Sequence, residues 1–156
     1  MLALVLLIPP ARAAEPLPVA VLELDYADTS GEPGDTRQLH AARLAHFTEA
    51  LRADLAKSGK FKVVTPSCDP APCAAGTADP SDLFAHARQA GARFMILGGV
   101  HKMSTLVQWA KVQMVDVVDD KVVLDKLVTF RGDDDEAWSR AENFIAGEIS
   151  AYPAGG

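Results

Sequence analysis

Between residues 106 and 131 the chain alternates apolar and polar side chains along two runs, separated by Asp119 and Asp120. This period of two is typical of half-buried β-strands, because successive side chains point to opposite faces of a sheet. We therefore expect two long strands, about Leu106–Val118 and Lys121–Arg131, joined by a tight turn. Such a pair has one apolar face to bury and one polar face to expose, which commits the chain to a sheet.

The other segments complete an α/β pattern. The 156 residues, 49% of them hydrophobic, suffice for one well-packed domain and are too few for two. The expected order β-α-β-α-β-β-β-α gives a single-layer mixed sheet of about five strands with three helices, over residues 14–156. The three further strands come from apolar, β-branched runs: Leu17–Tyr26, Lys60–Thr65 and Arg93–Val100.

Each expected helix has a start signal. Asp35 with Gln38 predicts a capping box for the first helix. Asp79 before a proline caps the second, and one aspartate of the run Asp133–Glu136 caps the third.

The first residues, MLALVLLIPPARAAEP, have the form of a secretory signal. The apolar run Leu2–Ile8 is too short to span a membrane, and cleavage is expected after Ala13, making residues 1–13 a signal peptide. No Lys or Arg precedes the run, which departs from the usual pattern and leaves open a start upstream of Met1. We therefore expect a periplasmic protein that does not span the membrane.

Cys68 and Cys73 flank two prolines in the segment CDPAPC. In an oxidising compartment such a pair is expected to form a disulfide. The alternatives are a metal site shared with Asp69 or His86, and free thiols; a redox CxxC motif is absent.

Charge and motifs exclude several functions. The net charge is −6 without any Lys/Arg run, which argues against nucleic acid and anionic membranes as ligands. The sequence has no phosphate loop or dinucleotide fingerprint, so no cofactor is expected.

The polar side of the two alternating strands is the candidate partner-binding surface. An indole among charged and amide side chains has the composition of an interface hot spot. The alternative is a solvated sheet face on which Lys111 pairs with Asp125. The candidate residues are His101, Trp109, Lys111, Gln113, Asp125 and Arg131.

Other chemistry has less support from the sequence. His101 with Ser104, or with Asp125 as its orienting group, is the only catalytic pairing considered, and no nucleophile-elbow motif accompanies it. His40, His46 and His86 are expected to be exposed or half-buried. The run Asp133, Asp134, Asp135 lacks calcium-loop spacing, so we expect a helix N-terminus, with a cation site as the alternative.

The segments PVAVLEL, FTEALRADLAKSGKFKVV, ARQAGARFMILGGV and KVQMVDVVDDKVVLDKLVTFRG resemble, in order and spacing, the amino-terminal domain of TolB and related CsgG-like envelope proteins. The stretch VHKMSTLVQWAKVQMVD also resembles a family of exported bacterial proteins of unknown function. The resemblance implies protein–protein contacts at the bacterial envelope. The β-propeller of TolB and the lipidated cysteine of CsgG-type channels are not found in this sequence.

Together these observations predict a non-enzymatic periplasmic binding or adaptor module. It would dock an envelope or periplasmic protein, or a small ligand, on the polar sheet face. A metal-binding periplasmic protein is the alternative and a hydrolase is the third hypothesis. The oligomeric state is left open.

Overall fold

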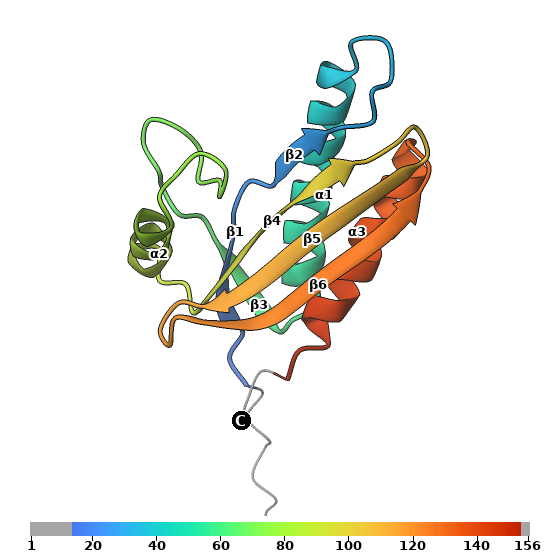
Figure 1. The fold of residues 1–156 in the computed structure, drawn as a ribbon. Coiled ribbons are helices and arrows are strands. Elements are labelled where there is room, and N and C mark those ends of the chain that lie inside the picture. The colour runs from blue at the N-terminus through green and yellow to red at the C-terminus, as the bar shows by residue number, and fades with distance from the viewer. Residues whose placement is uncertain (1–13, 154–156) are drawn as a thin grey trace, which may run out of the picture.

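The strands form one mixed sheet, seen in a computed structural model that describes residues 14–153 (Figure 1). The expected signal peptide lies outside the described residues. The strand order is β3-β1-β4-β5-β6, with β2 also paired to β4. The elements are β1 Leu17–Val21, β2 Asp25–Asp28, α1 Arg37–Lys57, β3 Phe61–Val64, α2 Pro80–Gln89, β4 Phe94–Lys102, β5 Val107–Asp116, β6 Lys121–Arg131 and α3 Asp135–Ser150.

The α/β class and the three helices are confirmed, but the sheet has six strands because the first expected strand is divided. β1 pairs with the start of β4 and β2 with its end, both in parallel. Between them the Glu23 N–H donates to the carbonyl oxygen of Cys73, at 2.8 Å. The backbone at Glu23 therefore pairs with the cysteine loop, which interrupts the ladder along β4.

Helices α1 and α3 lie side by side and in the same direction on one face of the sheet (Figure 1). Arg43 contacts Asp135 near the start of both helices, and Lys60 contacts the Ser150 carbonyl near their ends. The apolar side of α1 packs here against α3 and the sheet. The main core formed in this way includes Val19, Val21, Phe47, Leu51, Leu55, Ile96, Val112, Met114, Trp138, Ile145 and Ile149.

Helix α2 packs on the opposite face of the sheet, at the end formed by β1 and the start of β4. Helices therefore lie on both faces of the sheet. Leu83 and Ala87 of α2 contact a second core cluster that contains Leu22 and Met95. The expected disulfide between Cys68 and Cys73 is present, with Cα atoms 5.1 Å apart, and Cys73 belongs to this cluster.

The helix starts follow two of the three predictions. Asp79 accepts a hydrogen bond from the Ser81 N–H and Asp134 accepts one from the Ala137 N–H, so both cap their helices. The prediction of a capping box at Asp35 was wrong. The carboxylate of Asp35 binds the side chain of Arg37, and the N-cap residue of α1 makes no side-chain cap.

Candidate functional site

Within residues 14–153, no helix covers the part of the sheet formed by β5, β6 and the end of β4 on the α2 side (Figure 1). This surface is the candidate site. Because the strands are antiparallel and in register, the expected polar side chains do share one face. We call this surface the open face. Its residues are His101, Trp109, Lys111, Gln113, Asp125, Leu127, Thr129 and Arg131.

Trp109 is half-buried and held in place by its neighbour across the strands. The rings of Trp109 and His101 are directly paired, with centroids 4.9 Å apart and planes at 69°. His101 Nε2 is in turn hydrogen-bonded to Thr29 Oγ1, at 2.7 Å. This chain of contacts fixes the indole, so that less side-chain entropy would be lost when it contacts a partner.

A polar triplet lies next to the indole. Gln113 Nε2 donates to Asp125 Oδ2 at 2.8 Å, and Lys111 Nζ lies 3.5 Å from the same oxygen. The hydrogen bond from Gln113, followed by the charge of Lys111, lowers the pKa of the Asp125 carboxyl below its usual range. Lys111 remains 48% exposed, so its ammonium is accessible. Arg131 lies at the end of β6, exposed and opposite Val107.

Of the two open-face residues that were missing from the candidates, Thr129 and Leu127, the leucine matters more for the character of the surface. It is the direct neighbour of Lys111 across the strands and is 62% exposed. The alternation along β6 places it with Asp125 and Thr129, so the period of two was the available signal. An exposed leucine beside an indole makes the centre of the open face apolar and its surroundings charged.

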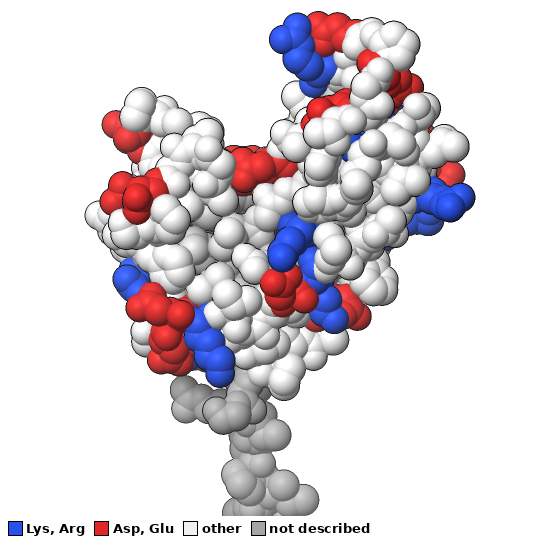
Figure 2. All heavy atoms as spheres, in the orientation of Figure 1, with Lys and Arg blue, Asp and Glu red and all other residues white. Residues whose placement is uncertain are grey.

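A glycine-floored groove runs beside the indole, between β2 and β5. Its volume is about 320 Å³, and its walls include Asp25, His101, Trp109 and Lys111. Gly99 lies in its floor, where an added Cβ would come 2.6 Å from the carbonyl oxygen of Asp25. Figure 2 shows this side of the molecule, with a notch between the part that carries α2 and the part that carries β2 and the start of α1. The backbone of β2 therefore packs closely against Gly99, and the absence of a side chain there leaves the groove open.

The catalytic pairing considered for His101 does not form. Its ring nitrogen binds Thr29, whereas Ser104 Oγ accepts hydrogen bonds from the N–H groups of Leu106 and Val107. The serine therefore stabilises the β4–β5 turn, and His101 supports the indole.

Behind the open face, the structure buries a charged group that the sequence had not singled out. Lys102 has no exposed side-chain surface, and its Nζ contacts Glu32 and lies 2.7 Å from Asp133 Oδ2. Burial lowers the pKa of Lys102, but the hydrogen bonds to Asp133 and Glu32 outweigh it, so the pKa lies above its usual range. The buried lysine thus ties the β2–α1 loop, through Glu32, to the segment before α3.

Asp133 is the centre of this buried cluster. His40 Nε2 lies 2.9 Å from Asp133 Oδ2, while Arg43 Nη1 and Gln108 Nε2 donate to Oδ1 at 2.8 and 3.2 Å. Burial raises the pKa of Asp133, but hydrogen bonds from Lys102 and His40 outweigh it and lower the pKa to about 2.

The expectation that His40 is exposed or half-buried was wrong, because its side chain is 1% exposed and stacks on Tyr26. Lys102 and Gln108, which pair across β4 and β5, fall on the helix-covered side of their strands. That position, readable from the alternation, was the signal for a buried polar cluster.

The three aspartates of the acidic run have different roles. Asp133 binds Lys102, His40 and Arg43, Asp134 caps α3, and Asp135 binds Arg43 Nε at 2.8 Å. Within residues 14–153 no group of three or more His, Cys, Asp or Glu side chains is arranged to hold a metal ion. The carboxylates are engaged by the protein's own cations and amides, so this geometry gives the metal hypothesis no support.

The sheet with its helices and its open face defines a TolB-like α/β domain. The chain belongs to the family DUF3280, described as "Protein of unknown function (DUF2380)", whose model matches residues 18–149. Among curated proteins no sequence matches the chain.

Solved structures share the fold at low sequence identity. The hypothetical protein CT253 from Chlamydia trachomatis is 12% identical with a TM-score of 0.59, over 88% of this chain and 97% of that one. TolB from Acinetobacter baumannii is 15% identical with a TM-score of 0.54, over 87% of this chain and 28% of TolB. The LpoB C-terminal domain from Escherichia coli is 16% identical with a TM-score of 0.53, over 78% and 87%.

These similarities establish the fold. None of the helices in the described part of the chain combines the length and apolar character needed to cross a bilayer.

Proposed function

We propose that this protein is a non-catalytic docking module of the bacterial envelope, which binds a protein partner on the open face. The observation that carries the proposal is a tryptophan held by His101 on a sheet surface that no helix of the described part of the chain covers. Trp109 with the exposed Leu127 supplies an apolar centre, and Lys111, Asp125 and Arg131 supply a charged surround. This is the arrangement of protein-binding hot spots, in which aromatic anchors are enclosed by polar side chains.

Localisation to the envelope is supported by independent features of the chain. A disulfide such as Cys68–Cys73 persists in oxidising compartments. The apolar segment with its expected cleavage site after Ala13 fits export to the periplasm. The fold shared with TolB and the LpoB C-terminal domain agrees with the same compartment. Docking of a partner requires no covalent chemistry by this protein, so the proposal names no catalytic residue.

The test is affinity capture from a periplasmic and envelope extract, with the chain from Ala14 onward as bait. The wild type is compared with Trp109→Ala/Lys111→Glu, which removes the anchor and reverses a neighbouring charge. Lys57→Glu is the charge control, because Lys57 is exposed at the end of α1, on the other side of the sheet. A partner retained by the wild type and by the control, and lost by the double variant, is expected.

Each captured protein is then purified and titrated against the same three baits. We expect the dissociation constant to rise by about tenfold or more for the double variant, because hot-spot truncations cost at least about 2 kcal/mol. The melting temperature should stay within a few degrees, since both side chains are partly exposed. Equal affinity for all three baits, or an unfolded double variant, would remove the open face as the docking surface.

A further inference from the structure

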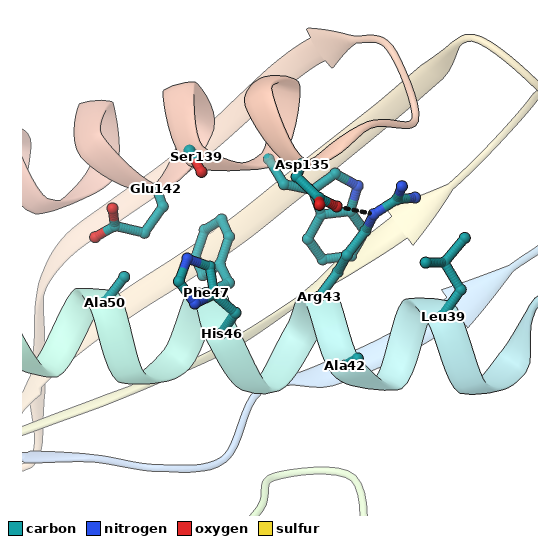
Figure 3. A pocket seen from close by; sticks show the side chains of 10 residues that line it. Leu39, Ala42, Arg43, His46, Phe47, Ala50, Asp135, Ser139 and Glu142 are labelled. Atoms are coloured by element: carbon teal, nitrogen blue, oxygen red, sulfur yellow. Dashed lines mark hydrogen bonds and ion pairs between the residues drawn. The ribbon is translucent and has the colours of Figure 1, made fainter.

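A second groove lies on the other side of the sheet, between α1 and α3. It has a volume of about 300 Å³, at the lower end of the range of small-molecule sites. Figure 3 shows side chains from both helices directed into it. The walls are largely apolar, with Leu39, Ala42, Phe47 and Ala50 from α1 and Trp138 from α3. No residue of the open face lines this groove, so it is a separate feature.

Glu142 is the unusual residue of the groove. Its side chain comes from α3 and is 3% exposed, and its Oε1 atom has no hydrogen-bond partner in the described protein. Burial, followed by the negative charge of Asp54 on α1, raises the pKa of Glu142 to about 7. A buried carboxylate without a partner is unfavourable, and the charge of a bound cation would offset this cost.

The other charged groups show which part of the groove is open to a ligand. At the end near the helix starts, Arg43 is already engaged by Asp133 and Asp135, at 2.8 Å each. At the Glu142 end the nearby charged group of α1 is Asp54, which is also acidic. His46 lies between these two ends, and no hydrogen bond within the described residues joins it to Glu142 (Figure 3). The Glu142 end therefore favours a positive ligand.

We propose that this groove binds a small organic cation, a protonated amine carried on an apolar body, with the ammonium group donating to Glu142. The apolar body would lie against Phe47 and Trp138, two aromatic rings in edge-to-face contact whose centroids are 6.3 Å apart. Aromatic faces attract ammonium groups, and a desolvated carboxylate strengthens the attraction. A groove of this volume holds one ring or a short alkyl chain, so the ligand must be small.

The chain carries its own reporters for the test. Its two tryptophans are Trp138, which lines this groove, and Trp109, which lies on the open face. Each gives one indole N–H resonance, and Trp109→Ala assigns them. Benzylammonium and the neutral, nearly isosteric benzyl alcohol are titrated into the protein to millimolar concentration near pH 8, where Glu142 is ionised.

Two matched variants accompany the wild type. Glu142→Gln removes the charge and keeps the shape. Glu136→Gln makes the same change on the same helix at an exposed carboxylate that pairs with Arg140 outside the groove.

Benzylammonium is expected to shift the Trp138 resonance saturably and to leave that of Trp109 unchanged. Its affinity should fall by about tenfold or more in Glu142→Gln and stay unchanged in Glu136→Gln. Benzyl alcohol should bind more weakly than the amine to the wild type and equally to all three proteins. The proposal is overturned if the amine gives no saturable shift, or binds the wild type and Glu142→Gln within twofold.

Capture of a protein on the open face is a separate result. Glu142→Gln leaves that surface intact, so it should retain the partner whether or not the amine binds. Failure of one proposal can therefore be told from failure of the other.

Discussion

The ammonium of Lys102 lies 2.7 Å from the carboxylate of Asp133 and has no exposed side-chain surface. Lys102 ends β4 and Asp133 lies in the segment just before α3, and a second contact of Lys102 reaches Glu32 in the β2–α1 loop. Three separate segments therefore meet at one buried charge. The groups satisfy one another only in the complete fold, because each alone would be an uncompensated buried ion.

Replacing Lys102 by Met should lower the free energy of unfolding by about 3 kcal/mol, because it leaves Glu32 and Asp133 without their shared cation. Urea denaturation at neutral pH measures this change. Lys111→Met is the matched control on the exposed side of the sheet and should change stability by less than about 0.5 kcal/mol. Equal effects of the two substitutions would contradict the buried role of Lys102.

Acid should lower the free energy of unfolding because Asp133 becomes protonated. Its pKa is lowered from 3.8 to about 2, so its stabilising contribution is present above the unfolded pKa and is lost as pH falls between these values. The loss amounts to about 2 kcal/mol. Asp133→Asn, compared with wild type by urea denaturation from about pH 6 to about pH 2, should be less stable at the upper end. The difference between the two proteins should shrink toward the lower end; a constant difference would argue against this ionisation.

Glu142 should make the protein less stable as pH rises. The pKa is raised from 4.5 to about 7, so the folded state holds a proton in this interval that the unfolded state has lost, and stability falls across it. Above about pH 7 both states are ionised and the loss, up to about 3 kcal/mol, is complete. Glu142→Gln should remove this slope and be the more stable protein near pH 8. Parallel stability–pH curves for the two proteins would refute the assignment.

Gly99 should not tolerate a side chain. A Cβ there would approach the Asp25 carbonyl oxygen to 2.6 Å, a contact with backbone that cannot move alone. Gly99→Ala is expected to lower the free energy of unfolding by about 1–3 kcal/mol and to narrow the groove beside Trp109. Gly147→Ala, with open space around its Cβ on α3, should instead raise it by about 0.5–1 kcal/mol. Thermal denaturation of both variants measures these changes, and a Gly99→Ala protein as stable as the wild type would contradict the prediction.

The disulfide should make a modest contribution to the free energy of unfolding. Cys68 and Cys73 are five positions apart, and closing so short a loop stabilises the fold by about 2 kcal/mol in the chain-entropy model. Cys68→Ser/Cys73→Ser should lose this amount in urea denaturation, and reduction of the wild type should reproduce the loss. A reduced wild type as stable as the oxidised one would show that the bond has no stabilising role.

Features that depend on near neighbours along the chain could be predicted from the sequence. The alternation in β5 and β6 predicted both strands and the common face of Trp109, Gln113 and Asp125. The start of α2 at Asp79 and the Cys68–Cys73 bond were also readable, because caps and short loops involve residues only a few positions apart.

The long-range contacts that replace the locally expected ones could be found only in the folded protein. The strand expected at Leu17–Tyr26 is divided because Glu23 pairs with the backbone of Cys73, fifty positions later. His40 is buried because the segment before α3 brings Asp133 against it, and Glu142 is shielded from solvent because α3 lies along α1. Local patterns report the period of an element. The burial and pairing of a charge depend on the segments that fold against it, and no local period encodes those.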